Sequence, residues 1–213
     1  MPEQIAWFDR VRRLRAIAQT GQTYTQDRFD RERFDELAEI ANSMLADLTG
    51  APLEKIVGIY LPERGYPTPK VDVRAGVFDD RGQILLVQEA GDGLWALPGG
   101  WADEQESPRL ACEREVFEES GYRVSAVKLA AIKDRSLHPY SPPRLEHVYK
   151  LLFVCELIGG SEAVNVETNI ETTAAGFFSL DALPELSVGR TLEDDLQLLW
   201  RHRREPSRPC YFD

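Results

Sequence analysis

Cysteine and histidine are scarce in this chain of 213 residues. The three cysteines, Cys112, Cys155 and Cys210, are far apart and odd in number. This pattern disfavours a disulfide framework and a zinc site, and it fits reduced thiols in a cytoplasm. The three histidines are equally scattered, so we do not expect a histidine-rich metal site.

Long apolar runs and a positive charge balance are also missing. No uninterrupted apolar run approaches the ~18 residues that a membrane span requires. The N-terminal stretch carries charges throughout and lacks the apolar core of a signal peptide. The formal net charge is -11, and an acidic surface repels the backbone of nucleic acids. We therefore expect a cytoplasmic protein that binds neither nucleic acid nor membrane.

The first fifty residues contain two stretches with helical periodicity. In the first, apolar residues recur at Trp7, Val11, Leu14 and Ala18, and Gly21 is placed as a helix stop. In the second, from about Phe29, the apolar positions are Phe34, Leu37, Ala41, Met44 and Leu48. Such stripes must be buried on each other, on the rest of the chain or on a second subunit. We assign residues 1–52 to a helical module, with dimerisation as the preferred role and packing within the chain as the alternative.

The remaining residues alternate between strand and helix patterns. A Pro- and Gly-rich connector (53–69) contains a short strand-like run at Ile56 to Tyr60, and residues 71–78 and 84–89 are predicted to form a hairpin. Further strands are predicted at 94–100, 123–136, 147–157 and 174–180, and helices at 107–120 and at 191–204, the latter capped by Thr191. This mixture predicts an α/β (α+β) domain with a mixed sheet over residues 70–206, followed by a short tail (207–213).

The stretch "LPGGWADEQESPRLACEREVFEESGY" (97–122) has clear helix boundaries. Ser107 suits the N-cap, Pro108 suits the first helical position, and Gly121 suits the left-handed stop. These signals determine where the side chains of the helix point.

Three acidic residues, Glu115, Glu118 and Glu119, fall within an arc of roughly 100° on this helix. They are either a solvated acidic face or a binding site for cations. Like charges at this spacing repel one another, and the helix dipole disfavours negative charge in the C-terminal half. The two preceding glycines permit close backbone approach and offer carbonyl oxygens, which Mg²⁺ and Mn²⁺ bind together with carboxylates. The pattern therefore favours a cation site.

Gly100, Glu106 and the run "REVFEESGY" (114–122) resemble the Nudix box, G-x5-E-x7-R-E-U-x-E-E-x-G-U, in which U is apolar. Only Tyr122 departs, because an aliphatic residue is usual at that position. The resemblance implies an α/β/α sandwich and an enzyme that cleaves the diphosphate of a nucleoside diphosphate linked to another group, X. The chemistry agrees, because cations can neutralise the phosphate oxygens and activate water.

The resemblance also implies roles for individual residues. The ligands that it implies for two or more Mg²⁺ or Mn²⁺ ions are the carboxylates of Glu115, Glu118 and Glu119 and the backbone carbonyl of Gly99. Glu118 or Glu119 would also hold or deprotonate the attacking water. Arg114 and Glu106 would form an ion pair that orients the acidic cluster.

Outside the box, the chain resembles a Nudix subgroup with a helical N-terminal module, whose members are described as ADP-ribose or CDP-choline pyrophosphatases. The resemblance implies that the substrate is a nucleoside diphosphate derivative and that the products are a nucleoside monophosphate and a phosphorylated X. In this subgroup a glycine often stands where this chain has Gln105.

Five further residues are candidates for the site, each with a structural alternative. Arg74, within a strand, could contact a phosphate. Trp101 could stack on a base or shape its loop. Glu171, and less so Glu167, could supply a fourth carboxylate from a loop. Tyr140 lies in a Pro-rich loop of the kind that often borders a site.

An alternative function is a non-catalytic Nudix-like module that senses a nucleotide and regulates a partner. Such a module would be expected to lose acidic residues of the box, and all of them are present here. An mRNA-decapping role is disfavoured by the negative charge and by the absence of a basic tract.

Overall fold

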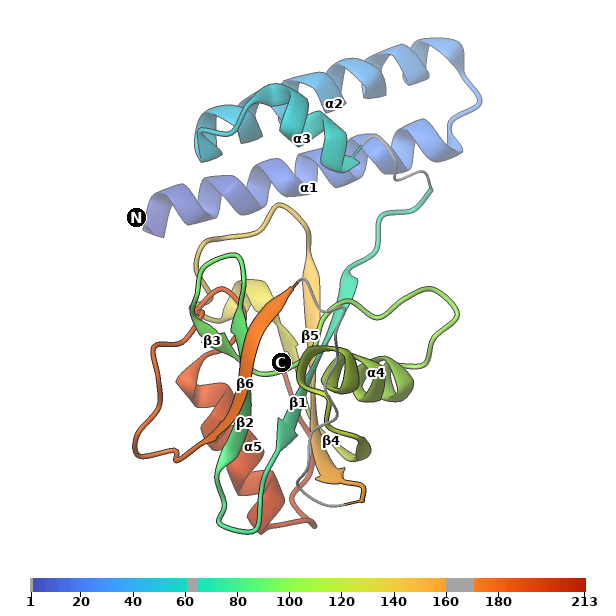
Figure 1. Cartoon of the computed structure of the whole chain (residues 1–213). Helices are drawn as coiled ribbons and strands as arrows, with labels where there is room; N and C mark the ends of the chain where they lie inside the picture. The colour runs from blue at the N-terminus through green and yellow to red at the C-terminus, as the bar shows by residue number, and fades with distance from the viewer. Residues whose placement is uncertain (1, 61–64, 160–170) are drawn as a thin grey trace. The chain divides into compact units, whose positions relative to one another are not determined.

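The computed structural model describes residues 2–60, 65–159 and 171–213. It divides into two compact units, Met1–Thr68 and Pro69–Asp213, which are considered separately here (Figure 1). Within the described residues, no helix is both long and apolar enough to cross a membrane.

The first unit is built from three helices, α1 (Pro2–Tyr24), α2 (Arg28–Thr49) and α3 (Leu53–Tyr60). Asp27 caps α2 by accepting a hydrogen bond from the backbone N–H of Asp30, and Gly50 ends it in the left-handed conformation. The residues that α1 and α2 bury include Val11, Ala18, Ala41 and Leu45. The two predicted helices are therefore present.

Three details of the first unit differ from the sequence-based predictions. Residues 56–60 belong to helix α3 rather than to a strand. Gly21 does not stop α1, which continues to Tyr24. The glycine instead leaves room for the ring of Phe34, which occupies the space where a side chain at position 21 would lie. Trp7 and Leu14 from the predicted stripe of α1 are exposed.

The second unit contains two sheets. Their strands are β1 (Lys70–Val77), β2 (Ile84–Glu89), β3 (Trp95–Ala96), β4 (Val124–Asp134), β5 (Val148–Leu157), β6 (Thr172–Phe178) and β7 (Tyr211–Phe212). The larger sheet has the order β1-β5-β4-β7 and the smaller β3-β2-β6. β5 is parallel to β1 and antiparallel to β4, so the predicted mixed sheet is confirmed.

The predicted hairpin of residues 71–78 and 84–89 is wrong. β1 pairs with β5, whereas β2 pairs with β3 and β6, and a single bridge between Phe78 and Ile84 joins the two runs. The turn between them exists, because the carboxylate of Asp79 accepts hydrogen bonds from the backbone N–H groups of Arg81 and Gln83. The two strands then enter different sheets.

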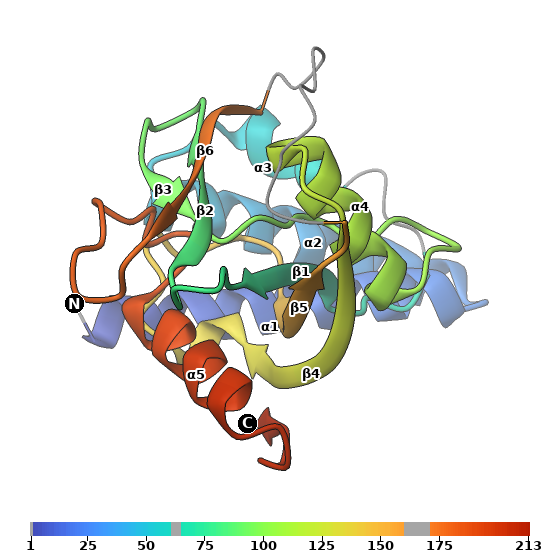
Figure 2. The ribbon, with the colours of Figure 1, turned by 60° about the horizontal axis from the view of Figure 1, so that its bottom comes forward.

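Two helices cover the sheets, α4 (Pro108–Ser120) and α5 (Glu193–Arg204), and a single 3-10 turn, η1 (Arg135–Leu137), follows β4 (Figure 2). Because side chains alternate along a strand, a central strand such as β5 contributes to two cores. Phe153 packs in the core that contains α4, and its neighbour Leu152 packs in the core that contains α5. The result is the predicted α/β/α arrangement.

The sequence-based prediction that Thr191 caps α5 is wrong. The N-cap residue is Leu192, whose backbone N–H donates to the carboxylate of Asp195. The hydroxyl of Thr191 instead accepts a hydrogen bond from the backbone N–H of Leu97 at 2.8 Å. It thereby ties the start of α5 to the segment that precedes the two glycines.

The contact between Gly21 and Phe34 predicts opposite effects of alanine at two helical glycines. Gly21→Ala should lower the melting temperature, because the added methyl group displaces the Phe34 ring, at a cost of roughly 1 to 3 kcal/mol. Gly58→Ala in α3 meets no atom within 4 Å and should raise stability by about 0.5 to 1 kcal/mol. Thermal unfolding of both variants measures the difference. Equal melting temperatures would contradict the packing described.

Candidate functional site

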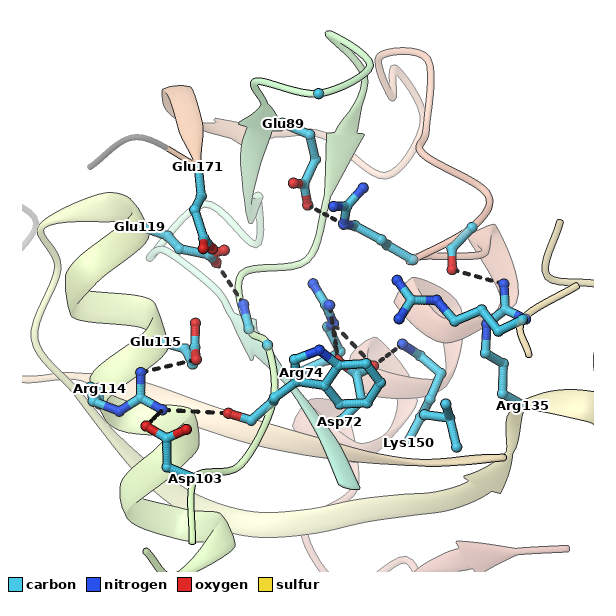
Figure 3. Close-up of a pocket in the computed structure, with 18 of the residues that line it drawn as sticks. Asp72, Arg74, Glu89, Asp103, Arg114, Glu115, Glu119, Arg135, Lys150 and Glu171 are labelled. Atoms are coloured by element: carbon cyan, nitrogen blue, oxygen red, sulfur yellow. Dashed lines mark hydrogen bonds and ion pairs between the residues drawn. The ribbon is translucent and has the colours of Figure 1, made fainter. Parts of the chain in front are cut away.

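The site begins with the placement of α4 in the second unit. Ser107 accepts a hydrogen bond from the backbone N–H of Leu110, Pro108 opens the helix, and Gly121 ends it with a φ of 74°, so all three predicted boundary signals are confirmed. This boundary directs the side chains of Glu115 and Glu119 into a pocket of about 670 Å³ (Figure 3).

The Gly99–Gly100 turn lies against both β1 and α4. Gly99 has a φ of 140°, and a side chain there would collide with the backbone of Val73. A Cβ atom at Gly100 would lie 2.9 Å from a carboxylate oxygen of Glu115. The backbone N–H of Val73 donates to the carbonyl of Gly100 at 2.8 Å, which fixes the turn along β1. Only glycine permits both approaches.

Glu119 is buried at the centre of this arrangement. It is 9% exposed, and its Oε2 accepts a hydrogen bond from the backbone N–H of Gly99 at 2.7 Å. Burial raises the pKa of Glu119 to about 8, against the opposing effects of Arg74 and the Gly99 N–H. Burial likewise raises the pKa of Glu115. The positive charge near the two carboxylates therefore does not offset the cost of burying them as anions.

Arg114 contacts three glutamates of the motif, Glu106, Glu115 and Glu118. It donates to both carboxylate oxygens of Glu106, at 3.1 and 3.0 Å, and to Glu115 at 3.0 Å and Glu118 at 2.9 Å. The bidentate contact lowers the pKa of Glu106. One guanidinium thus holds three carboxylates in place.

The remaining predicted carboxylates take different positions. Glu118 is 56% exposed at its side chain and does not line the pocket, although it lies on the same helix as Glu115. Glu171 does line the pocket, and Glu167 lies outside the described residues. Among the described residues, no three Asp, Glu, His or Cys side chains already converge as a metal-binding group.

A buried ion-pair cluster forms the floor of the pocket. Asp72 contacts both Arg74, at 2.9 Å, and Lys150. Asp72 and Lys150 meet because they are register partners on the parallel strands β1 and β5. Desolvation alone would raise the pKa of Asp72, but the two cations outweigh it and hold this pKa at about 2. Arg74 lines the pocket and is also bound to Asp72 and to the carbonyl of Leu97.

Glu89, at the end of β2, is a buried carboxylate of the pocket that sequence reasoning missed. It forms an ion pair with Arg190 at 3.0 Å. Burial raises its pKa, and Glu171 contributes in the same direction. The only sequence signal was a polar residue at the end of an apolar strand, which is common at strand ends. Lys150 carried a stronger signal, as a lone cation within the apolar run "VYKLLFVCEL".

The far side of the pocket carries two more arginines, Arg135 and Arg144. The guanidinium of Arg144 lies 5.2 Å from the ring centroid of Trp101, which lines the pocket and is 39% exposed. Arg144 therefore covers part of the ring that was a candidate for base stacking.

Tyr140 is not among the residues that line the pocket. It is 5% exposed, and its hydroxyl donates to the carboxylate of Asp195, with distances of 2.9 and 2.8 Å to the two oxygens. Its ring centroid lies 5.2 Å from the Nζ atom of Lys150. Tyr140 thus supports the cluster beneath the pocket from behind.

Each of the two units matches the model of a known protein family. The model of the family described as "NUDIX domain" matches residues 68–199, and the one described as "UDP-X-like, N-terminal oligomerisation domain" matches residues 6–60.

Three relatives extend this result. The Bacillus subtilis (strain 168) protein named "Putative ADP-ribose pyrophosphatase YjhB" is 41% identical over 99% of this chain and 98% of its own length. The crystal structure of an ADP-ribose pyrophosphatase from Streptococcus suis 89-1591 is 42% identical, covers 68% of this chain and 100% of its own, and has a TM-score of 0.59. A crystal structure named UDP-X diphosphatase is 32% identical over 98% of this chain and 99% of its own, also with a TM-score of 0.59.

The raised pKa of Glu119 predicts a specific dependence of stability on pH without divalent cations. The folded protein keeps a proton on Glu119 up to about pH 8, whereas the unfolded chain releases it near 4.5. Between these values the folded state binds more protons, so this contribution to stability is complete below about 4.5 and is lost as the pH rises through about 8.

The free energy of unfolding of Glu119→Gln, relative to that of the wild type, should therefore increase by a few kcal/mol when the pH is raised from about 5 to about 8.5. Urea unfolding in a chelator at both pH values measures this gain. Glu104→Gln, which changes an exposed carboxylate, is the matched control and should show no such gain. The same pH dependence in wild type and Glu119→Gln would contradict a pKa of Glu119 that burial raises.

Proposed function

The chain belongs to the Nudix family and is a pyrophosphatase of that family, and we propose that it hydrolyses the diphosphate bond of a nucleoside diphosphate linked to another group with the help of divalent cations. The observation that carries the proposal is the burial of Glu115 and Glu119 beside the Gly99–Gly100 turn, which raises the pKa of both carboxylates.

The donors at this position suit Mg²⁺ or Mn²⁺, because all of them are oxygen atoms. Glu115 and Glu119 would hold two or more ions together with the carbonyl of Gly99, and Glu118 would join them by turning from Arg114. When bound, such ions neutralise the phosphate oxygens and lower the pKa of the attacking water.

The protein's own residues would orient the reactants. Arg114 sets the positions of the carboxylates through its contacts with Glu106, Glu115 and Glu118. Between Glu118 and Glu119, we assign the attacking water to Glu119, because Glu119 lines the pocket and Glu118 is largely exposed. Glu171, which directly precedes β6, would assist from the same side of the pocket, and Arg74 would contact a phosphate oxygen on the floor of the pocket.

We propose substrates of the ADP-ribose and UDP-X type, supported by the names of the relatives, with CDP-choline as a further member of the class. The products would be a nucleoside monophosphate and a phosphorylated X, for example AMP and ribose 5-phosphate from ADP-ribose. The described cysteines are all unpaired, which supports a cytoplasmic location.

Glu119→Gln should lower kcat on ADP-ribose by at least about a hundredfold, because it removes the charge assigned to the water and the cations. Glu118→Gln should reduce kcat less. Release of AMP with Mg²⁺ or Mn²⁺, and after addition of a chelator, measures both effects. Near-normal turnover of Glu119→Gln, or turnover that persists in the chelator, would refute the proposed mechanism.

We also propose that residues 1–52 form a dimerisation module, with residues 70–206 as the catalytic domain. The match to an oligomerisation domain supports this, as do three apolar residues that α1 exposes on one face, Trp7, Leu14 and Ile17.

Sedimentation should therefore give twice the mass of one chain, and Leu14→Asp should shift the protein toward the monomer, because it places a charge in the apolar face. Leu137→Asp, at an exposed leucine of the second unit, is the matched control and should remain dimeric. A wild type that sediments as a monomer would refute the assignment.

A further inference from the structure

The pocket has its charges separated in space. Glu115, Glu119 and Glu171 lie on one side, Arg135 and Lys150 lie on the other, and Asp72 and Arg74 lie between them (Figure 3). The proposed hydrolysis uses the acidic side and the floor of the pocket. It does not use the basic side.

Most cations of the pocket are neutralised by a carboxylate of the protein. Arg74 and Lys150 share Asp72, and Arg190 is paired with Glu89. Arg135 and Arg144 form no ion pair with an Asp or Glu side chain within the part of the chain that the structure describes. The basic side therefore carries excess positive charge.

Arg135 is buried with a free donor. It is 6% exposed, and its Nη2 atom donates to the carbonyls of Pro142 at 2.8 Å and Gly189 at 3.2 Å. Its Nε atom is buried and has no hydrogen-bond partner among the described residues. A buried donor without a partner is costly, so Arg135 is held beside the pocket with its hydrogen-bonding capacity incompletely used.

Arg144 adds a second unpaired guanidinium nearby. Burial, and next the charge of Arg144, lower the pKa of Arg135, so the two groups repel each other. Trp101 holds Arg144 in place by a cation–π contact of 5.2 Å. Two neighbouring cations that form no ion pair among the described residues are the counterpart of the acidic cluster on α4, although the charges of Asp72 and Glu146 act on Arg135 from farther away.

We propose that Arg135 and Arg144 form a subsite for an anionic group, a phosphate or a carboxylate, that the substrate carries in addition to its diphosphate. The inference rests on the proposed function. An anionic group at this position would form an ion pair with Arg144 and offset the repulsion between Arg144 and Arg135. A cationic group such as choline would add to the repulsion, so CDP-choline becomes the least favoured substrate of the class.

Matched substrates test the subsite and identify which end of the substrate enters it. UDP-glucuronate differs from UDP-glucose by a carboxylate on the X group, and 2′-phospho-ADP-ribose differs from ADP-ribose by a phosphate on the nucleoside. In one of the two pairs, kcat/KM of the wild type should favour the more anionic member by about tenfold or more. Ratios near or below one in both pairs would overturn the proposal.

Variants of Arg144 tie this preference to the subsite. Arg144→Gln should reduce the favoured ratio about tenfold toward one, and Arg144→Lys should retain part of it, because the charge remains without the planar fork. Arg204→Gln is the matched control, because Arg204 lies 5.6 Å from the ring of Trp200, outside the pocket, and its loss should leave the ratio unchanged. An undiminished ratio in Arg144→Gln would also overturn the proposal.

Calorimetric binding separates this inference from the proposed function. In a chelator, the more anionic member of the favoured pair should bind the wild type more tightly than its partner, and Arg144→Gln should remove the difference. Preferential binding without hydrolysis on addition of Mg²⁺ or Mn²⁺ would sink the proposed function and leave the subsite standing. Hydrolysis of all four substrates without any preference in rate or binding would refute the subsite and support the proposed function.

Discussion

The close approach of the Gly99–Gly100 turn to β1 and α4 is the constraint on which the site depends. Gly99 lies against the backbone of Val73, and its N–H donates to Glu119. Gly100 lies against the carboxylate of Glu115. The turn thereby excludes water from two carboxylates and leaves them with few counter-charges. The capped helix α4 packs on the sheet and thereby holds both side chains at this position.

The pocket uses the same principle twice, with opposite signs. On the α4 side, buried carboxylates exceed the cations available to them, and Arg114 and Arg74 offset the imbalance only in part. On the other side, Arg135 and Arg144 exceed the available carboxylates. Each imbalance costs stability in the free protein and is relieved by a partner of opposite charge. A site of this kind is preorganised for ligands that bring cations to one side and an anion to the other.

Sequence reasoning succeeded where structure is determined locally. Ser107, Pro108 and Gly121 define α4 through contacts within a few residues, so its boundaries could be predicted. Sequence reasoning failed where contacts with segments distant in the sequence determine which strands pair and which side chains meet. Residues 71–78 and 84–89 have the pattern of a hairpin, but their partners lie in β5 and β6. The same limit hid Lys150, because its meeting with Asp72 depends on the register of β1 and β5.

Sharing a helix face also did not guarantee a shared environment, since Glu118 remains exposed beside the buried Glu119. The left-handed conformation of Gln105, φ 66°, was signalled by the glycine that is frequent at that position in similar chains.

The pairing of Asp72 with Lys150 joins residues that are 78 positions apart in the sequence. Parallel pairing of this kind closes a long loop, and such contacts form late and slowly as a chain folds. A partly folded chain in which α4 is already helical would therefore have its acidic cluster but no floor beneath it. The ability to hold a diphosphate arises together with the sheet, and it is lost as one event when the sheet opens.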